Sequence, residues 1–116
     1  MAKNLRIEEK YSNSVINLAL DTLKIEKQAL VFVNTKRSAE KTAEEISIKI
    51  KTESNELSKL SEEILNALSS PTKQCQRLAM CVKKGIAFHH AGLAQKQRNL
   101  IEDSFRKGMI KIISCT

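Results

Sequence analysis

Apolar residues recur along the chain at two different spacings, and each spacing predicts one type of element. In several segments they return every three or four positions, which places them on one face of a helix. These segments are residues 12–24, 36–50, 57–68, 71–84 and 97–106. Elsewhere the apolar residues are grouped in short stretches. Residues 29–33 form an all-apolar run, which is typical of a parallel strand covered by helices on both faces. Residues 85–90 and 109–115 are predicted as two further strands.

The order of these segments predicts the fold class. Strands that alternate with helices form a parallel sheet with right-handed crossovers, so we expect an α/β domain whose parallel sheet is flanked by helices. The pair of helices from about residue 54 to residue 84 is longer than one crossover needs, and it predicts a helical insertion between the first two strands. The sequence stops at Thr116, directly after a strand, where open α/β sheets usually bind ligands. We therefore expect a fragment whose sheet is truncated on its C-terminal side.

Length and hydropathy indicate a single domain. The chain has 116 residues, which suits one domain and not two. Residues 1–11 are mostly polar and are expected to form a poorly ordered lead-in, so the domain is predicted over residues 12–116. No apolar run approaches the roughly 18 residues of a membrane span, and the first ten residues lack a signal-peptide pattern. We expect no membrane partner and a cytoplasmic location, or a nuclear one in a eukaryote.

Positive charge exceeds negative charge, with 20 Lys and Arg against 13 Asp and Glu and a net charge of +7. Such a field attracts polyanions, although scattered lysines that only confer solubility would give the same sum. Aromatic residues are 3% of the chain, too few for a base-stacking platform, so a nucleic acid would be held mainly by its phosphates. Cys75, Cys81 and Cys115 lie in apolar patterns without CxxC spacing, and we expect them to be reduced and buried.

The first candidate site follows the first predicted strand. Asn34 and Thr35 end the apolar run, and Lys36 and Arg37 open the next helix. A helix N-terminus offers free backbone N–H groups, and a threonine hydroxyl with two basic side chains would complete a phosphate seat. An N-capped helix with a solvated basic first turn explains the same residues. Basic residues oppose the helix dipole at this end, however, and so need another reason to be there.

The second candidate site is the segment from His89 to Leu93. Gly92 lets backbone approach a ligand closely, and His90 can donate a hydrogen bond to a phosphate or ribose oxygen. Adjacent side chains of a strand point to opposite faces, so the two histidines cannot easily share a metal ion. We expect no metal site, and instead one structural and one contacting histidine. The third site, Ser114 to Thr116, adds only hydroxyl groups at another strand end.

Several motifs are absent from the sequence. It contains no Gly-x-x-x-x-Gly-Lys-Ser/Thr phosphate loop and no Gly-x-Gly-x-x-Gly. No acidic pair follows a strand to hold magnesium, and no Ser or Cys nucleophile stands at a recognisable spacing from a base. We therefore expect no catalytic residue in this chain and no ATP hydrolysis by the chain alone.

Taken in order, the three sites resemble a known family. Residues 30–40, LVFVNTKRSAE, resemble motif IV of Ski-type superfamily-two helicases, and residues 85–93, GIAFHHAGL, are similar to the phrase that follows it. Arg98, Phe105 and Gly108 fall where the family's next helix carries such residues, and the final strand resembles the one that opens motif V. The resemblance extends over nearly the whole chain and is closest to the archaeal repair helicases related to the helicase part of DNA polymerase theta.

The resemblance implies a second RecA-like domain of an ATP-dependent 3′-to-5′ DNA helicase that acts in DNA repair or replication-fork processing. Such a domain closes with the first RecA-like domain over ATP and holds single-stranded or forked DNA with its strand-end loops. Thr35 and Arg37 would contact phosphates, His90 and Gly92 would line the same path, and Thr116 would begin motif V. ATP and magnesium would belong to the parent protein, whose first RecA-like domain and remaining chain are the other expected partners.

Two other interpretations stay open. The chain could be a stand-alone basic α/β module that binds nucleic acid without motor activity. It could also be an unrelated α/β regulatory domain whose positive charge is incidental. RNA-unwinding relatives share this domain type, so the choice of DNA depends on the similarity of motif IV and the histidine phrase to the repair subgroup.

Overall fold

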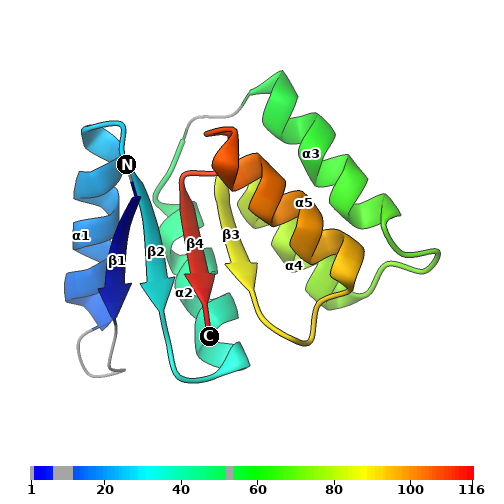
Figure 1. The fold of residues 1–116 in the computed structure, drawn as a ribbon, viewed down its shortest axis with the longest axis horizontal. Coiled ribbons are helices and arrows are strands. Elements are labelled where there is room, and N and C mark those ends of the chain that lie inside the picture. Colours follow the sequence, from blue (N-terminus) through cyan, green and yellow to red (C-terminus); the bar gives the residue numbers. More distant parts are fainter. Residues whose placement is uncertain (1, 7–11, 52–53) are drawn as a thin grey trace.

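The computed structural model of the chain describes residues 2–6, 12–51 and 54–116 (Figure 1). The elements in chain order are β1 (Ala2–Arg6), α1 (Ser12–Lys24), β2 (Gln28–Phe32), α2 (Lys36–Ile48), α3 (Asn55–Asn66), α4 (Lys73–Val82), β3 (Ile86–His89), α5 (Gln95–Arg106) and β4 (Ile112–Cys115). Their alternation confirms the predicted α/β fold, which is consistent with a fragment of a RecA-like domain. None of the described helices is long and apolar enough to cross a membrane.

The sheet contains four strands in the order β1-β2-β4-β3, and every neighbouring pair is parallel. β4 therefore lies between two strands that precede it in the chain. Phe32 of β2 and His89 of β3 are both level with Cys115 of β4. The three strands end at the same height, and the loops that follow them consequently begin at one edge of the sheet.

β1 differs from the sequence-based expectation. The pattern of apolar positions predicts no element before residue 12, whereas Ala2–Arg6 pair with Gln28–Phe32. Because β1 stands at the end of the strand order, it pairs on one side only, and polar residues are common in such edge strands. Met1 and residues 7–11 of the predicted lead-in lie outside the described residues. With β1 counted, the helical insertion α3–α4 lies between the second and third strands.

Helices cover both faces of the sheet. The connections from β1 to β2 and from β2 to β3 cross the sheet in one direction, and the connection from β3 to β4 returns. Right-handed crossovers then place α1 and α2 on one face and α5 on the other, and Figure 1 shows α2 behind the sheet and α5 in front. α4 packs beside α2, and α3 packs on α4 and reaches α5.

The hydrophobic core lies mainly between the sheet and α2. Phe88 of β3 is completely buried, and all four residues of β4 are buried, as expected for a strand inside a parallel sheet. β2 is less covered than its all-apolar run predicts. Val31 faces the core, whereas Leu30 and Phe32 on the α5 side are only partly buried, because α5 packs against β3.

The cysteines agree with the sequence-based prediction. Cys75, Cys81 and Cys115 are all free and buried. Burial raises the pKa of the Cys81 thiol to about 11, because the thiolate would lose its hydration. This cysteine is therefore a packing residue and not a nucleophile at neutral pH.

A buried amide fastens the helical insertion to α5. Gln97 is 1% exposed, and its Nε2 donates to the carbonyl oxygen of Ile64 in α3 at 3.2 Å. Its Oε1 accepts from the backbone N–H of Ala94 at 3.3 Å, just before the first turn of α5. One side chain thus caps α5 and holds the insertion against it.

Candidate nucleic-acid interface

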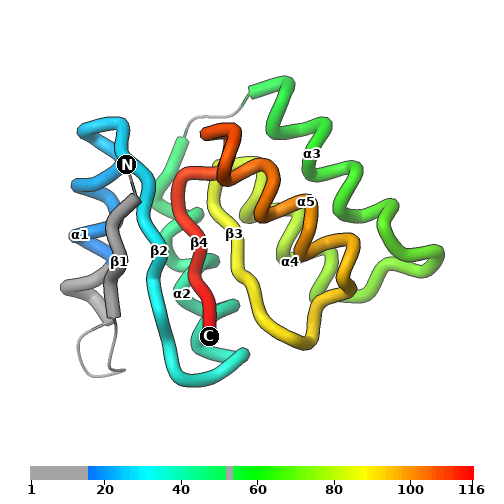
Figure 2. The backbone as a smooth tube through the Cα atoms, viewed as in Figure 1, coloured from blue at the N-terminus to red at the C-terminus, as the bar shows by residue number. Residues whose placement is uncertain are grey.

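The structure brings the three predicted sites to one edge of the sheet. The loops after β2, β3 and β4 contain Thr35, His90 and Thr116 respectively, and their strands are parallel and in register. The backbone N–H of Val33 donates to the carbonyl oxygen of Cys115 at 2.8 Å, which holds the first and third sites together. Figure 2 shows the chain end at β4 between the turns that follow β2 and β3. We call this the strand-end edge.

Thr35 is the N-cap of α2. Its Oγ1 accepts from the backbone N–H of Ser38 at 3.0 Å, and its φ and ψ of −133° and 156° are those of an extended residue before a helix. The N-capped helix considered in the sequence analysis is therefore present. Lys36 and Arg37 form its exposed first turn, where helix geometry leaves backbone N–H groups without an intrahelical partner. Free donors and two cations thus lie together at this end of α2.

The His90 side chain is buried and faces α2. It has no exposed surface, its Nε2 lies 2.7 Å from Glu40 Oε2, and its Nδ1 accepts from the backbone N–H of Gly92 at 3.0 Å. Because Nδ1 is an acceptor, Nε2 must carry the proton and donate it to the carboxylate. The ring also stacks on Phe88, with centroids 5.7 Å apart and planes 10° apart. Both ring nitrogens are therefore occupied within the protein.

Glu40 is the centre of a polar network that the sequence analysis does not predict. Besides His90, its Oε2 accepts from Gln74 Nε2 at 2.8 Å, and its Oε1 accepts from Arg77 Nη1 at 2.7 Å. Arg77 also pairs with Glu44, one turn further along α2. Burial raises the pKa of Glu40, but the hydrogen bonds from Gln74 and His90 and the charge of Arg77 outweigh it, so this pKa lies below its usual value.

The depressed pKa of Glu40 predicts a loss of stability in acid. A carboxylate stabilised in the folded state contributes stability that is present above its unfolded pKa of about 4.3 and is lost as pH falls through the lower folded value. Urea unfolding of the wild type and of Glu40→Gln, which resembles the protonated acid, should differ most near neutral pH. The difference should shrink steadily below about pH 4. A difference that is constant with pH would show that the charge of Glu40 does not stabilise the fold.

Gly92 is exposed and packs closely on the His90 ring. A Cβ at this position would lie 3.0 Å from both Nδ1 and Cε1 of His90, so any other residue would push the ring or the loop aside. The same Cβ would lie 3.8 Å from Cδ of Lys36. The loop after β3 therefore lies directly beside the basic first turn of α2. Two of the predicted sites meet here.

The two histidines point to opposite faces, as predicted. His89 lies on the α5 side, where its Nε2 is 3.9 Å from Glu102 Oε2, while His90 lies on the α2 side. Across the described part of the chain there is no group of three metal-ligating side chains. His90 is expected from the sequence to contact a phosphate or ribose oxygen, whereas its buried ring, bonded at both nitrogens, occupies the structural position.

A signal for the missed network is present in the sequence of α2. Glu40 stands three residues before Ala43 and seven before Ser47, and all three are buried. A carboxylate on the inner side of an amphipathic helix requires partners, because a buried charge without them is costly. That spacing identifies Glu40 as unusual, but it does not show that the partners come from α4 and from the loop after β3.

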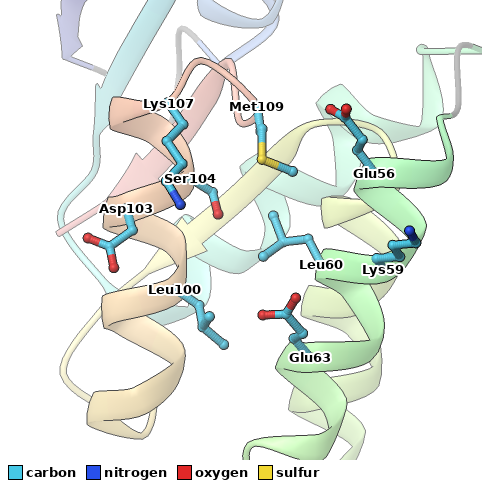
Figure 3. A pocket seen from close by; sticks show the side chains of 9 residues that line it. All are labelled: Glu56, Lys59, Leu60, Glu63, Leu100, Asp103, Ser104, Lys107 and Met109. Atoms are coloured by element: carbon cyan, nitrogen blue, oxygen red, sulfur yellow. The ribbon is translucent and has the colours of Figure 1, made fainter.

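A groove lies between α3 and α5, away from the strand-end edge. Its volume is about 400 Å³, and Figure 3 shows Leu60 of α3 and Leu100 of α5 pointing into it, with Met109 at one end. The rim carries charges of both signs: Glu56, Lys59, Glu63, Asp103 and Lys107. This mixture favours no particular class of ligand.

No protein-family model matches the chain, but several curated proteins that share one name are similar to it. The chain is 44% identical over 108 residues to a protein of Methanocaldococcus jannaschii named ATP-dependent DNA helicase Hel308. Proteins of the same name from Thermococcus kodakarensis and Pyrococcus abyssi are each 46% identical, over 108 and 110 residues.

These matches include about 90% of this chain but only a small part of each relative. The chain spans 9% of the Methanocaldococcus jannaschii protein and 15% of the Pyrococcus abyssi protein. The extent and identity of the matches agree with the helicase resemblance found in the sequence. Over nine tenths of its length, the chain is thus similar to one segment of the archaeal Hel308 DNA helicases.

Proposed function

We propose that this chain is part of the second RecA-like domain of an ATP-dependent DNA helicase of the Hel308 type. In this proposal the strand-end edge holds the sugar–phosphate backbone of single-stranded or forked DNA. The observation that carries the proposal is the parallel, in-register arrangement of β2, β4 and β3. It places three polar loops side by side at the edge where α/β sheets bind ligands.

The site residues divide into contacting and supporting groups. Thr35 and Arg37 contact phosphate groups from the first turn of α2, and the exposed Gly92 and Thr116 lie along the same path. Lys36 adds a second cation at the point where the loops meet. His90 acts through the loop that it holds, because its ring is buried and both of its nitrogens are already bonded.

The motor activity belongs to the parent protein in this proposal. The sequence contains no phosphate loop, so ATP and magnesium would be bound by other segments, chiefly the first RecA-like domain. Closure of the two domains over ATP would move the strand-end edge along DNA with 3′-to-5′ polarity. A role in DNA repair or replication-fork processing is what the resemblance of motif IV and the histidine phrase to the repair helicases implies, and it is part of the proposal.

A salt titration tests the proposed interface. Each phosphate contact to a single strand contributes roughly 0.7 to the slope of log affinity against log salt. Arg37→Ala should therefore make the slope for a labelled single-stranded oligonucleotide shallower by roughly 0.7 to 1 and weaken binding at low salt. Fluorescence anisotropy of the wild type and the variant at several salt concentrations gives both quantities.

The matched control is Arg106→Ala. α5 begins at the strand-end edge and ends at Arg106, which therefore lies at the other end of the helix and pairs with Asp103. Its replacement removes the same charge away from the interface. Its slope should equal that of the wild type. Equal slopes for all three proteins, or no binding by the wild type even at low salt, would reject the strand-end edge as a nucleic-acid site.

A further inference from the structure

A continuous set of hydrogen bonds joins the helical insertion to the strand-end edge. It begins at Gln74 and Arg77 of α4, passes through Glu40 of α2 and His90, and ends at the backbone N–H of Gly92. The donor–acceptor distances along it lie between 2.7 and 3.0 Å. Three segments far apart in the sequence thus meet in one network.

The middle of this network is enclosed. The side chain of Glu40 is 10% exposed and that of His90 is not exposed at all, while the His90 ring rests on Phe88 in the core. A buried ionic group rarely stabilises a fold more than apolar residues of the same volume would. What it does supply is a fixed geometry, because Gln74, Arg77 and His90 all direct a donor at the one carboxylate of Glu40. Here the group with the fixed geometry is the loop from His90 to Gly92.

We propose that Glu40 and His90 are positioning residues for the strand-end edge, and that the helical insertion sets the position of the Gly92 loop through Gln74 and Arg77. The proposal builds on the proposed function, since the positioned loop is one of its DNA contacts. In this proposal the insertion has a regulatory role, because a change at α4 alters the affinity for DNA without any contact between α4 and DNA.

Electrostatics and positioning predict opposite results for one substitution. Glu40 carries a negative charge close to the basic first turn of α2, so its removal by Glu40→Gln should strengthen DNA binding if only charge matters. If Glu40 positions the loop, the same variant should bind a single-stranded oligonucleotide roughly three- to tenfold more weakly. The sign of the change therefore separates the two explanations.

Matched controls exist on both helices. Glu45→Gln removes the same charge from α2 at a residue whose ion-pair partner within the described residues is Lys41, and it should bind as well as the wild type or slightly better. Gln74→Met breaks the network from α4 without changing any charge, and it should weaken binding roughly two- to fivefold. Its neighbour Gln76 is exposed, and Gln76→Met should have no effect.

A spectroscopic measurement tests the network in the absence of DNA. The chain has three glycines, so selective ¹⁵N-glycine labelling gives three amide signals, and the Gly92 signal reports the bond to His90 Nδ1. This signal should shift in Glu40→Gln and in Gln74→Met and should stay in place in both controls. Circular dichroism establishes that each variant is folded, and if Glu40→Gln is not, Gln74→Met provides the test.

The outcomes separate this inference from the proposed function. If the wild type binds DNA and the folded network variants bind equally well or more tightly, the positioning role is wrong while the interface stands. If the wild type does not bind, the proposed function fails, and an unmoved Gly92 signal would then overturn the network itself. Weaker binding together with a shifted Gly92 signal, in the network variants alone, supports positioning.

Discussion

Phe88→Ala is expected to lower the free energy of unfolding by about 3–5 kcal/mol, the usual cost of truncating a fully buried phenylalanine. Phe88 has no exposed surface, stands in β3 and supports the His90 ring. The free energy of unfolding of a domain of this size is about 5–15 kcal/mol, so the variant should retain only a small part of it. Urea unfolding followed by far-ultraviolet circular dichroism measures the change, and it needs no tryptophan, which the chain lacks.

Ile48→Ala provides the control for this prediction. Ile48 is a large apolar residue at the end of α2, but it is 80% exposed, and substitutions at such positions usually change stability by less than about 0.5 kcal/mol. If Phe88→Ala were as stable as Ile48→Ala, the described packing of β3 against α2 would be incorrect.

Gln97→Met should lower the free energy of unfolding by about 1–3 kcal/mol, although it nearly conserves the side-chain volume. The Ala94 N–H would lose its acceptor, and the Ile64 carbonyl would keep only the longer bond from Ala67 at 3.4 Å. A buried polar group left without a partner costs about 1–3 kcal/mol. The loss should appear as a lower urea midpoint with an unchanged slope.

Gln95→Met, two residues earlier in α5, is the control that separates the loss of the Gln97 hydrogen bonds from a change in helix propensity. Gln95 is exposed, and among the described residues its side chain bonds to Asn99 and Arg98, both in its own helix. Its replacement should shift stability by less than about 0.5 kcal/mol. Equal losses for both variants would show that Gln97 does not join α3 to α5.

The periodicity of apolar residues predicts most of this fold, because it records burial directly. The helices and three of the strands appear at or near the predicted residues. The clearest prediction is the common edge of Thr35, His90 and Thr116, because parallel strands must end on the same side of a sheet. Strand direction and connection order are sufficient for that inference.

The features that the sequence does not reveal depend on pairings between distant residues. β1 is recognisable only through its partner β2, since its own residues show no alternation of apolar and polar positions. The inward position of His90 depends in the same way on Glu40, fifty positions earlier in the chain. A histidine beside a glycine at a strand end is compatible with both ligand contact and loop support, and only the location of the carboxylate favours the second.

The central place of β4 has a consequence for how the protein is made. Translation delivers β2 and β3 before β4, and these two strands have no hydrogen bonds to each other in the sheet. Until β4 has left the ribosome and paired, a gap of roughly two strand spacings, about 10 Å, separates β2 from β3. The nascent chain therefore exposes two unsatisfied strand borders, and β4 closes both at once when it pairs.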